Sequence, residues 1–269
     1  MRRPIGIFDS GVGGLSVARE VRRAMPLEDV VYVADTAYCP YGDRPLDEVR
    51  ERSLAVGRHL EAAGAKLLVA ACNTATGAAL ESLRATLAIP VVGLEPAVKT
   101  GVALTRNRRI GVMATSGTLR SERFARLLSA HADGVQVVAQ ACPGLADLIE
   151  QGHLDDHVLR AQLEVLTAPL REAAVDTVVL GCTHYAFVRG PLAAALGPEV
   201  QLVDSAPAIA RRTEQLLRQR ALGESSGAAG AIRVLTTGDP AIVSPVIERL
   251  WSEPLSVEAV EIERGRGSQ

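Results

Sequence analysis

The fold is decided by two similar stretches, Val69-Ala70-Ala71-Cys72-Asn73-Thr74 and Val179-Leu180-Gly181-Cys182-Thr183-His184. In each, an apolar run typical of a buried parallel strand stops at a cysteine, and polar residues able to bind a substrate follow at once. Open α/β sheets bind ligands in the crevice beyond the carboxyl ends of their strands. The two stretches therefore predict two thiols that point into one cleft and act on two faces of one small molecule.

The composition is that of a globular protein of 269 residues with a formal net charge of -2. This charge and an aromatic content of 3% argue against a dedicated nucleic-acid binder, which needs basic and stacking side chains. No apolar run approaches the roughly 20 residues that span a bilayer, so we expect no membrane partner. Met1-Arg2-Arg3-Pro4 leads directly into a strand-like run rather than a signal-peptide core, which predicts a cytoplasmic protein.

The four cysteines are expected to be free thiols in a reducing compartment. They are Cys39, Cys72, Cys142 and Cys182. Cysteines of this kind are often just small buried hydrophobes, and we interpret Cys39 and Cys142, which precede prolines in loop-like contexts, as structural. The other two differ because each ends an apolar strand.

Short apolar runs alternate with amphipathic stretches, which predicts an α/β fold with mainly parallel sheets. The expected strands are 5–8, 30–34, 67–71, 91–94, 110–113, 135–138, 177–180, 201–203, 232–236 and, at the end, 257–262. Apolar residues at helical spacing predict helices at 15–25, 49–60 and 241–251, with Gly64 ending the second.

An internal repeat is indicated by three correspondences at nearly constant offset. Gly6-Ile7-Phe8 resembles Gly111-Val112-Met113, the cysteine frames recur about 110 residues apart, and Val92 before Pro96 resembles Val203 before Pro207. The repeat predicts two similar three-layer α/β domains related by pseudo-two-fold symmetry, with the active site in the cleft between them.

We expect a discontinuous first domain at 1–97 plus 209–269 and a second domain at 98–208. The tail would then pack back onto the first domain. The small polar segment 223–230 is expected to be a flexible connection, and 264–269 to be disordered.

A glycine-rich loop, Asp9-Ser10-Gly11-Val12-Gly13-Gly14, follows the first expected strand. Glycines let a backbone approach a ligand, and a helix N-terminus offers amides to an anion. Ser16 stands where a dinucleotide fingerprint needs a third glycine, and no P-loop sequence follows. We therefore expect a small carboxylate-bearing ligand, with Asp9 as a candidate catalytic residue or, alternatively, a helix-cap or turn residue.

Other candidates lie in later loops. In 35–43, the Tyr41 hydroxyl and the Gly42 amide could clamp a substrate, the alternative being a surface turn. His184 could tune or share the proton of Cys182, while Glu150 is a weaker candidate. His153 and His157 have the spacing of a metal pair, but we interpret them as a solvated helix start.

Together these motifs resemble the cofactor-independent glutamate racemases of the aspartate/glutamate racemase superfamily. The resemblance spans nearly the whole chain and rests on 8–14, 40–42, 71–75, 180–185 and 237–239. It implies interconversion of free L- and D-glutamate without a cofactor or metal, which supplies D-glutamate for bacterial peptidoglycan.

By this resemblance, Cys72 is the base that acts on the D isomer and Cys182 the base that acts on the L isomer. Asp9, His184 and Glu150 would assist proton transfer. The substrate-binding residues it implies are Asp9, Ser10, Tyr41, Gly42, Asn73, Thr74, Thr183 and His184. The sequence departs from the common family pattern at Tyr38-Cys39 and at Ala186.

Three alternatives remain at this stage. The nearest is a racemase or isomerase of another acidic amino acid, such as aspartate. A pyridoxal-phosphate racemase is poorly supported, because the chain has only two lysines, Lys66 ahead of a strand and Lys99 near a helix start. An amino-acid-binding protein would need a signal peptide and no thiol pair. Glutamate is the expected partner, and a homodimer is a further expectation.

Overall fold

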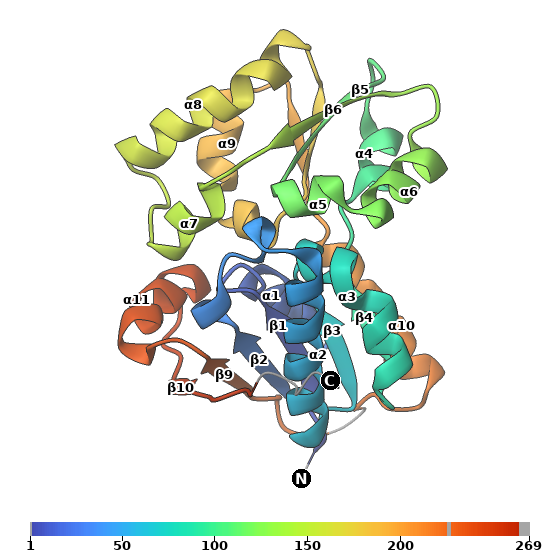
Figure 1. The fold of residues 1–269 in the computed structure, drawn as a ribbon, viewed down its shortest axis with the longest axis vertical. Helices are drawn as coiled ribbons and strands as arrows, with labels where there is room; N and C mark the ends of the chain where they lie inside the picture. The colour runs from blue at the N-terminus through green and yellow to red at the C-terminus, as the bar shows by residue number, and fades with distance from the viewer. Residues whose placement is uncertain (1, 225–226, 264–269) are drawn as a thin grey trace.

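The computed structural model describes residues 2–224 and 227–263. In that part of the chain, parallel strands form two sheets, one of six strands and one of four. Figure 1 shows the two sheets one above the other, each with helices on its faces. We call the six-stranded sheet with its helices the first unit and the four-stranded sheet with its helices the second unit. The loops after β1 (Ile5–Asp9) and β3 (Leu67–Ala70) of the first unit point toward the second unit.

The first sheet has the order β10-β9-β2-β1-β3-β4. Its strands are β1 (Ile5–Asp9), β2 (Val30–Ala34), β3 (Leu67–Ala70), β4 (Val91–Gly93), β9 (Ile232–Thr236) and β10 (Val257–Ala259). Because β9 pairs with β2 and β10 with β9, the tail of the chain extends this sheet, as the sequence predicts. β1 and β3 are buried throughout, which is typical of parallel strands covered on both faces.

The second sheet has the order β6-β5-β7-β8. Its strands are β5 (Arg109–Ala114), β6 (Gln136–Ala141), β7 (Thr177–Leu180) and β8 (Gln201–Val203). This is the same order as the β2-β1-β3-β4 core of the first sheet, so the predicted repeat is present as repeated topology. Cys72 follows β3 and Cys182 follows β7, which are equivalent strands.

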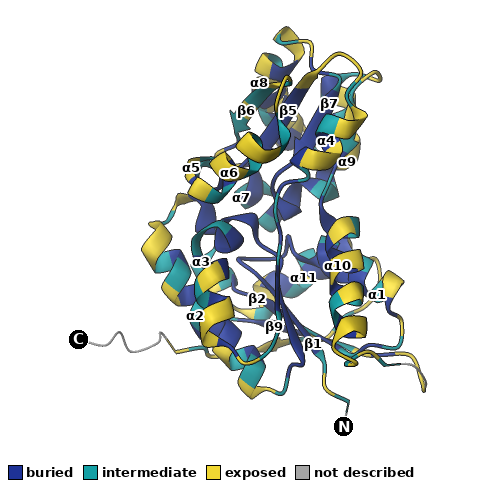
Figure 2. Ribbon diagram, turned by 90° about the vertical axis from the view of Figure 1, so that its right-hand side faces the viewer, coloured by how far each residue is buried: buried dark blue, intermediate teal, exposed yellow. Residues whose placement is uncertain are grey.

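Helices cover both faces of each sheet. On the first sheet, α1 (Leu15–Ala24), α10 (Ala206–Gln219) and α11 (Pro240–Trp251) share one hydrophobic core, and α2 (Leu46–Ala62) and α3 (Asn73–Thr86) share another. On the second sheet, α7 (Leu145–Glu150), α8 (His157–Glu172) and α9 (Arg189–Leu196) pack on one face, and α4 (Val98–Leu104) and α6 (Glu122–His131) on the other. Figure 2 shows buried residues in the strands and exposed residues on the outer helix faces.

Short elements complete the connections. They are α5 (Ser116–Arg120) and the 3-10 helices η1 (Thr36–Tyr38), η2 (Tyr41–Asp43) and η3 (Thr183–Val188). They have three to six residues each, which is too short for the spacing of apolar residues to predict them.

The predicted strands are all present, with some ends displaced. β6 runs to Ala141, three residues beyond its expected end. It is an edge strand whose residues are exposed or half-buried, so the polar side chain of Gln140 does not have to be buried and does not end the strand. α2 begins at Leu46, three residues early, directly after Pro45. Gly64 follows α2 with φ of 89°, a conformation that favours glycine, so its predicted role as terminator is confirmed.

The division at 1–97 plus 209–269 and at 98–208 stays a prediction. α10 begins at Ala206 and packs against α1 of the first unit. Within 223–230, residues 225 and 226 lie outside the described residues, as does the expected disordered end at 264–269. In the residues that are described, no helix is both long enough and apolar enough to cross a membrane.

Candidate active site

The candidate site lies where the loops after β1 and β3 meet the loop after β7. Thr183 Oγ1 donates a hydrogen bond to Asp9 Oδ2 at 2.9 Å, and Val12 N donates to Glu150 Oε1 at 2.7 Å. Both bonds join the first unit to the second. The structure therefore brings together the residues that sequence analysis placed in separate frames.

Cys72 is 6% exposed and lies between β3 and α3. Its Sγ caps α3 by accepting from Ala75 N at 3.5 Å and lies 3.9 Å from Ser10 Oγ. Burial, and then the charge of Asp9, raise the pKa of Cys72 to about 12, although the Ala75 amide opposes this shift. Cys72 is therefore a neutral thiol at neutral pH.

Cys182 has different neighbours. Its Sγ lies 3.5 Å from His184 Nδ1, and His184 Nε2 lies 2.6 Å from Glu150 Oε1. Burial by itself lowers the pKa of His184, but Cys182 and Glu150 outweigh it and raise this pKa well above its usual value. A protonated ring can donate to both partners at once, to Cys182 through Nδ1 and to Glu150 through Nε2.

Asp9 is fully buried between the two cysteine frames. Its Oδ1 accepts from Gly11 N at 3.0 Å and Ser10 Oγ at 3.1 Å, and its Oδ2 accepts from Thr183. Burial is the main cause of a raised pKa for this carboxyl, against the lowering effects of His184 and the hydrogen bonds.

The glycine-rich loop packs closely against the second unit. A Cβ on Gly11 would lie 1.9 Å from Glu150 Oε1, and a Cβ on Gly13 would lie 2.3 Å from His184 Nδ1. Both glycines therefore make room for side chains of the second unit, and the expected carboxylate-bearing ligand stays a prediction. The sequence could not show this, because the partners are more than 130 residues away.

Asn73 is a candidate ligand-binding residue because its side-chain amide is buried and unsatisfied among the described residues. Its side-chain Nδ2 and Oδ1 are both buried without a hydrogen-bond partner among the described residues. Such groups cost free energy until a ligand or water satisfies them. Asn73, Cys182 and Thr183 line a small cavity of about 10 Å³, which has room for about one water molecule and places polar groups beside a thiol.

Thr74 lies beside two hydroxyls that sequence analysis missed. Its Oγ1 is 2.9 Å from Thr115 Oγ1 and 3.3 Å from Thr118 Oγ1. The available signal was the repeat, since Thr115 follows β5 as the glycine-rich loop follows the equivalent β1.

Tyr41 and Gly42 enter the site as a rigid loop. The Tyr41 hydroxyl donates to Asp35 Oδ2, which fixes its position; its role as a clamp on the substrate stays a prediction. Asp35 also forms a buried bidentate ion pair with Arg52, with N–O distances of 2.8 and 2.7 Å. Gly42 packs against the second unit, since a Cβ there would lie 2.7 Å from Thr115 Cβ. Neither Asp35 nor Arg52 was identified from sequence.

The remaining candidates lie apart from this cluster. His153 Nδ1 bonds Asp156 Oδ2 at 2.5 Å, and Asp156 caps α8 through the Val158 and Leu159 amides. This fits the interpretation of His153 and His157 as a helix start. Cys142 is buried and bonded to the Gln140 carbonyl, in line with a structural role.

Two buried thiols at equivalent strand ends, near enough for Cys182 to raise the pKa of Cys72, are typical of an enzyme that moves protons on two faces of one carbon. The Asp/Glu/hydantoin racemase family model matches residues 15–213. The chain belongs to this family.

Individual relatives cover nearly the whole chain. A protein of Pseudomonas paraeruginosa (strain DSM 24068 / PA7), named glutamate racemase, is 47% identical over 260 residues, which are 96% of this chain and 98% of that one. The crystal structure of a glutamate racemase isoform from Bacillus anthracis has a TM-score of 0.89 at 33% identity, over 97% of this chain and 98% of the other. Escherichia coli glutamate racemase in complex with L-glutamate and the activator UDP-MurNAc-ala has a TM-score of 0.86 at 32% identity, over 97% and 99%.

Proposed function

We propose that this protein is a glutamate racemase that interconverts L- and D-glutamate by proton transfer between two thiols, Cys72 and Cys182. The observation that carries the proposal is the contrast between these thiols at equivalent strand ends. One is a buried neutral thiol, while the other is paired with an imidazolium. A two-base racemase needs one acid and one base at the same moment.

In the direction from L to D, the Cys182 thiolate removes the α-proton of L-glutamate, and the Cys72 thiol delivers its proton to the opposite face. Cys72 is left as the thiolate and Cys182 as the thiol, which is the state that D-glutamate requires. The two groups titrate as a pair and exchange roles at each turnover. Glu150 orients His184 through a 2.6 Å contact, and His184 Nδ1 lies 3.5 Å from Cys182 Sγ, where it can share the proton of this thiol.

The intermediate carries extra negative charge on the α-carboxylate, and neutral donors in the site stabilise it. Asn73, Thr74, Thr183 and Ser10 are the donors we assign to the substrate, together with the amides of the Tyr41-Gly42 loop. Asn73 and Thr74 stand in the first turn of α3, where the helix dipole favours an anion. We assign Asp9 to proton transfer on the Cys72 side, since its charge bears on that thiol.

A Schiff-base mechanism finds no lysine in a suitable place. Lys66 precedes β3, at the end of the strand opposite Cys72, and its Nζ pairs with Glu28 Oε2 at 2.6 Å. Lys99 is exposed on α4. A cofactor-independent reaction fits these positions.

The alternative substrate is another acidic amino acid, such as aspartate. Relatives that are 47% identical and span both chains carry the name glutamate racemase, which favours glutamate. Turnover of L-aspartate at a rate comparable to that of L-glutamate, measured with a chiral readout, would contradict the assignment.

We place the reaction in the cytoplasm, where D-glutamate is supplied to peptidoglycan synthesis. A homodimer is part of the proposal, and analytical ultracentrifugation of the purified protein measures it.

The decisive experiment follows chirality and α-deuterium together. L-Glutamate in heavy water, with no added cofactor, is expected to racemise with solvent deuterium in the D product. Cys72→Ala and Cys182→Ala should each lose racemisation, with α-proton exchange restricted to L-glutamate in the first variant and to D-glutamate in the second. Racemisation that survives in both variants rules out the two-thiol mechanism.

A further inference from the structure

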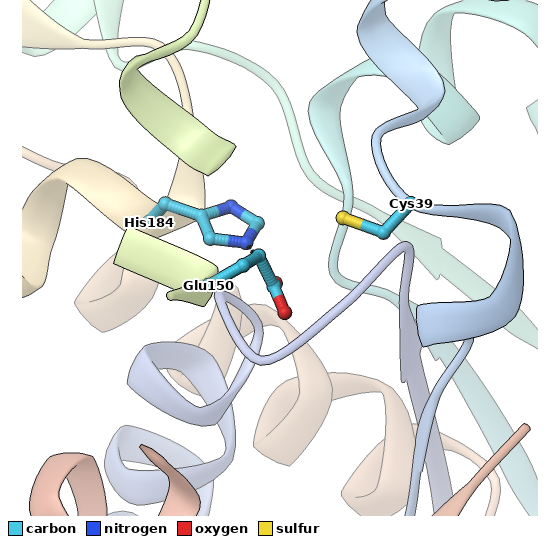
Figure 3. Close-up of side chains that lie close together, drawn as sticks. All are labelled: Cys39, Glu150 and His184. Carbon is cyan, nitrogen blue, oxygen red and sulfur yellow. Dashed lines mark hydrogen bonds and ion pairs between the residues drawn. The ribbon is translucent and has the colours of Figure 1, made fainter. Parts of the chain in front are cut away.

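Three side chains that can ligate a metal ion converge at one edge of the site. A sulfur of Cys39, a carboxylate oxygen of Glu150 and a ring nitrogen of His184 all lie within 4.8 Å of one another. Figure 3 shows the Cys39 sulfur pointing toward the Glu150 carboxylate, with the His184 ring on the other side. Within the part of the chain that the structure describes, this is the one group of three His, Cys, Asp or Glu residues with such spacing.

Cys39 has no role in the proposed reaction. Cys39 is half-buried, follows η1, and comes from a different loop than either cysteine base. It nevertheless lies against the proton-transfer residues, since a Cβ on Gly11 would approach both the Cys39 Sγ, at 3.0 Å, and the Glu150 carboxylate. The thiol is therefore placed beside the Glu150–His184 pair without belonging to it.

We propose that Cys39, Glu150 and His184 form a binding site for a thiophilic divalent cation such as Zn²⁺, and that its occupation stops racemisation. Thiolate, imidazole and carboxylate are the donors that zinc takes in proteins, and three protein ligands leave a fourth position for water. Zinc–ligand bonds of about 2.0–2.3 Å bring tetrahedral donors to roughly 3.5 Å from one another. For a metal to bind, the Glu150–His184 pair at 2.6 Å has to open, and the more distant donors have to approach by about 1 Å.

The local charge favours a cation. Burial is the main cause of a strongly raised pKa for Cys39, and the next causes are the negative charges of Glu150 and Asp9. The same charges that oppose a thiolate attract a divalent cation. On binding, the metal–sulfur and metal–nitrogen bonds form while the protons of the Cys39 thiol and the His184 imidazolium pass to solvent. The thiolate and the Glu150 carboxylate then balance the two positive charges.

A cavity leads to the proposed metal site. Cys39 and Glu150 line a cavity of about 220 Å³ between α7 and α11, whose wall includes Ile242 and Val246. An ion can approach two of the three ligands through it.

Inhibition follows from the ligands themselves. A metal on the His184 nitrogen that faces Glu150 takes the place of the proton that the two residues share. The His184 ring is then positioned by the metal instead of by Glu150, and its contact with Cys182 Sγ, at 3.5 Å without metal, is disturbed. Cys182 can then no longer act as the base for the L isomer.

The inhibitory part of this inference rests on the proposed racemase activity, whereas metal binding does not, so the two are measured separately. Co²⁺ added to the purified full-length protein is expected to give a thiolate-to-cobalt charge-transfer band with a stoichiometry of one. Cys39→Ala should lose the band, and Cys142→Ala, which removes a buried thiol elsewhere, should keep it. Cys39→Ser serves the same comparison where the alanine variant folds poorly.

The activity assay then uses Zn²⁺ with L-glutamate. Cys39→Ala should racemise glutamate at the wild-type rate without metal, and its zinc inhibition constant should rise by about 10-fold or more, on the scale of a lost ligand contribution. A chelator should restore the wild-type enzyme. An absent cobalt band, or zinc inhibition of equal strength in Cys39→Ala, overturns the proposal, the second outcome assigning the metal to Cys72 and Cys182 instead.

Discussion

At the scale of the residue, neighbours rather than residue type separate the two cysteines. Cys72 caps a helix and is buried beside Asp9, while Cys182 contacts an imidazolium held by Glu150. The sequence marks both cysteines in the same way, because each follows an apolar strand. The Cys182–His184 contact is local in sequence, whereas Glu150 reaches His184 from 34 residues away, so this part of the surroundings appears only in the folded protein.

Gly11→Ala tests this arrangement because it adds only a methyl group and removes no polar group. Its added Cβ would fall 1.9 Å from Glu150 Oε1, so the carboxylate must leave His184. We expect kcat to fall on the order of 10²-fold, the scale of a lost acid–base group, with Tm little changed. Gly190→Ala is the matched control, because nothing lies within 4 Å of the added Cβ. Full activity in Gly11→Ala would show that Glu150 is not needed where it stands.

Asp9→Asn is expected to stabilise the protein while it lowers activity. The asparagine keeps the shape and an oxygen for the Gly11 amide, and it removes a charge whose burial is unfavourable. The pKa of Asp9 is higher in the folded protein than in the unfolded chain, where it is about 3.9. The wild type therefore loses stability as the pH rises from about 4 through the folded pKa, and the variant does not. The gain in Tm should be absent at low pH and should grow as the pH rises.

Asp176→Asn is the control of opposite sign. Thr105 and the amides of Arg106 and Asn107 hold the pKa of Asp176 below its usual value against the effect of burial. This carboxyl stabilises the fold above its unfolded pKa, so its removal should lower Tm at neutral pH. Equal signs for the two variants across a thermal-melt pH series would contradict the assignment of Asp9.

At the scale of the element, the Arg52–Asp35 pair fixes the loop between β2 and α2. Both side chains are buried, and Asp35 also accepts from Tyr41 and Thr237. These contacts fix the loop in one conformation, in which Tyr41 and Gly42 face the second unit. Removing one partner of a buried pair leaves an uncompensated charge, which costs about 3–5 kcal/mol.

Arg52→Ala is accordingly expected to lower the free energy of unfolding by about 3 kcal/mol and to raise KM for glutamate more than it lowers kcat. Arg23→Ala, at the exposed Arg23–Glu20 pair, should leave Tm unchanged. Adding Asp35→Asn to Arg52→Ala removes the orphaned charge and should recover part of the stability. A double variant no more stable than the single one would exclude the charge as the cause.

Strands and long helices were predictable because burial imposes a short apolar run or a helical period. The strand ends displaced by three residues belong to the edge strands β6 and β10, whereas ends of central strands differ from the prediction by one residue at most. Sequence reasoning found Cys72, Cys182, Asp9 and His184 because strand ends mark them. It missed Thr118 and Arg52, which reach the site through α5 and α2 rather than from a strand end.

At the scale of the whole molecule, the site exists only where the two units meet. Asp9 and Cys72 belong to the first sheet, Cys182 and His184 to the second, and the Thr183–Asp9 bond joins them. A substrate held between the units should stabilise both together, by about 2.7 kcal/mol at 100 times its Kd.

Hydrogen exchange with racemic glutamate, whose composition does not drift during the measurement, tests this coupling. We expect slower exchange at Ala75 N, which bonds Cys72 Sγ, and at Val12 N, which bonds Glu150 from the other unit. Asn107 N, bonded to Asp176 at an exposed turn before β5, should exchange at an unchanged rate, and leucine, which lacks the side-chain carboxylate, should protect none of these amides. Protection of Ala75 without Val12 would mean that glutamate binds one wall only, and that the second thiol does not reach the same carbon.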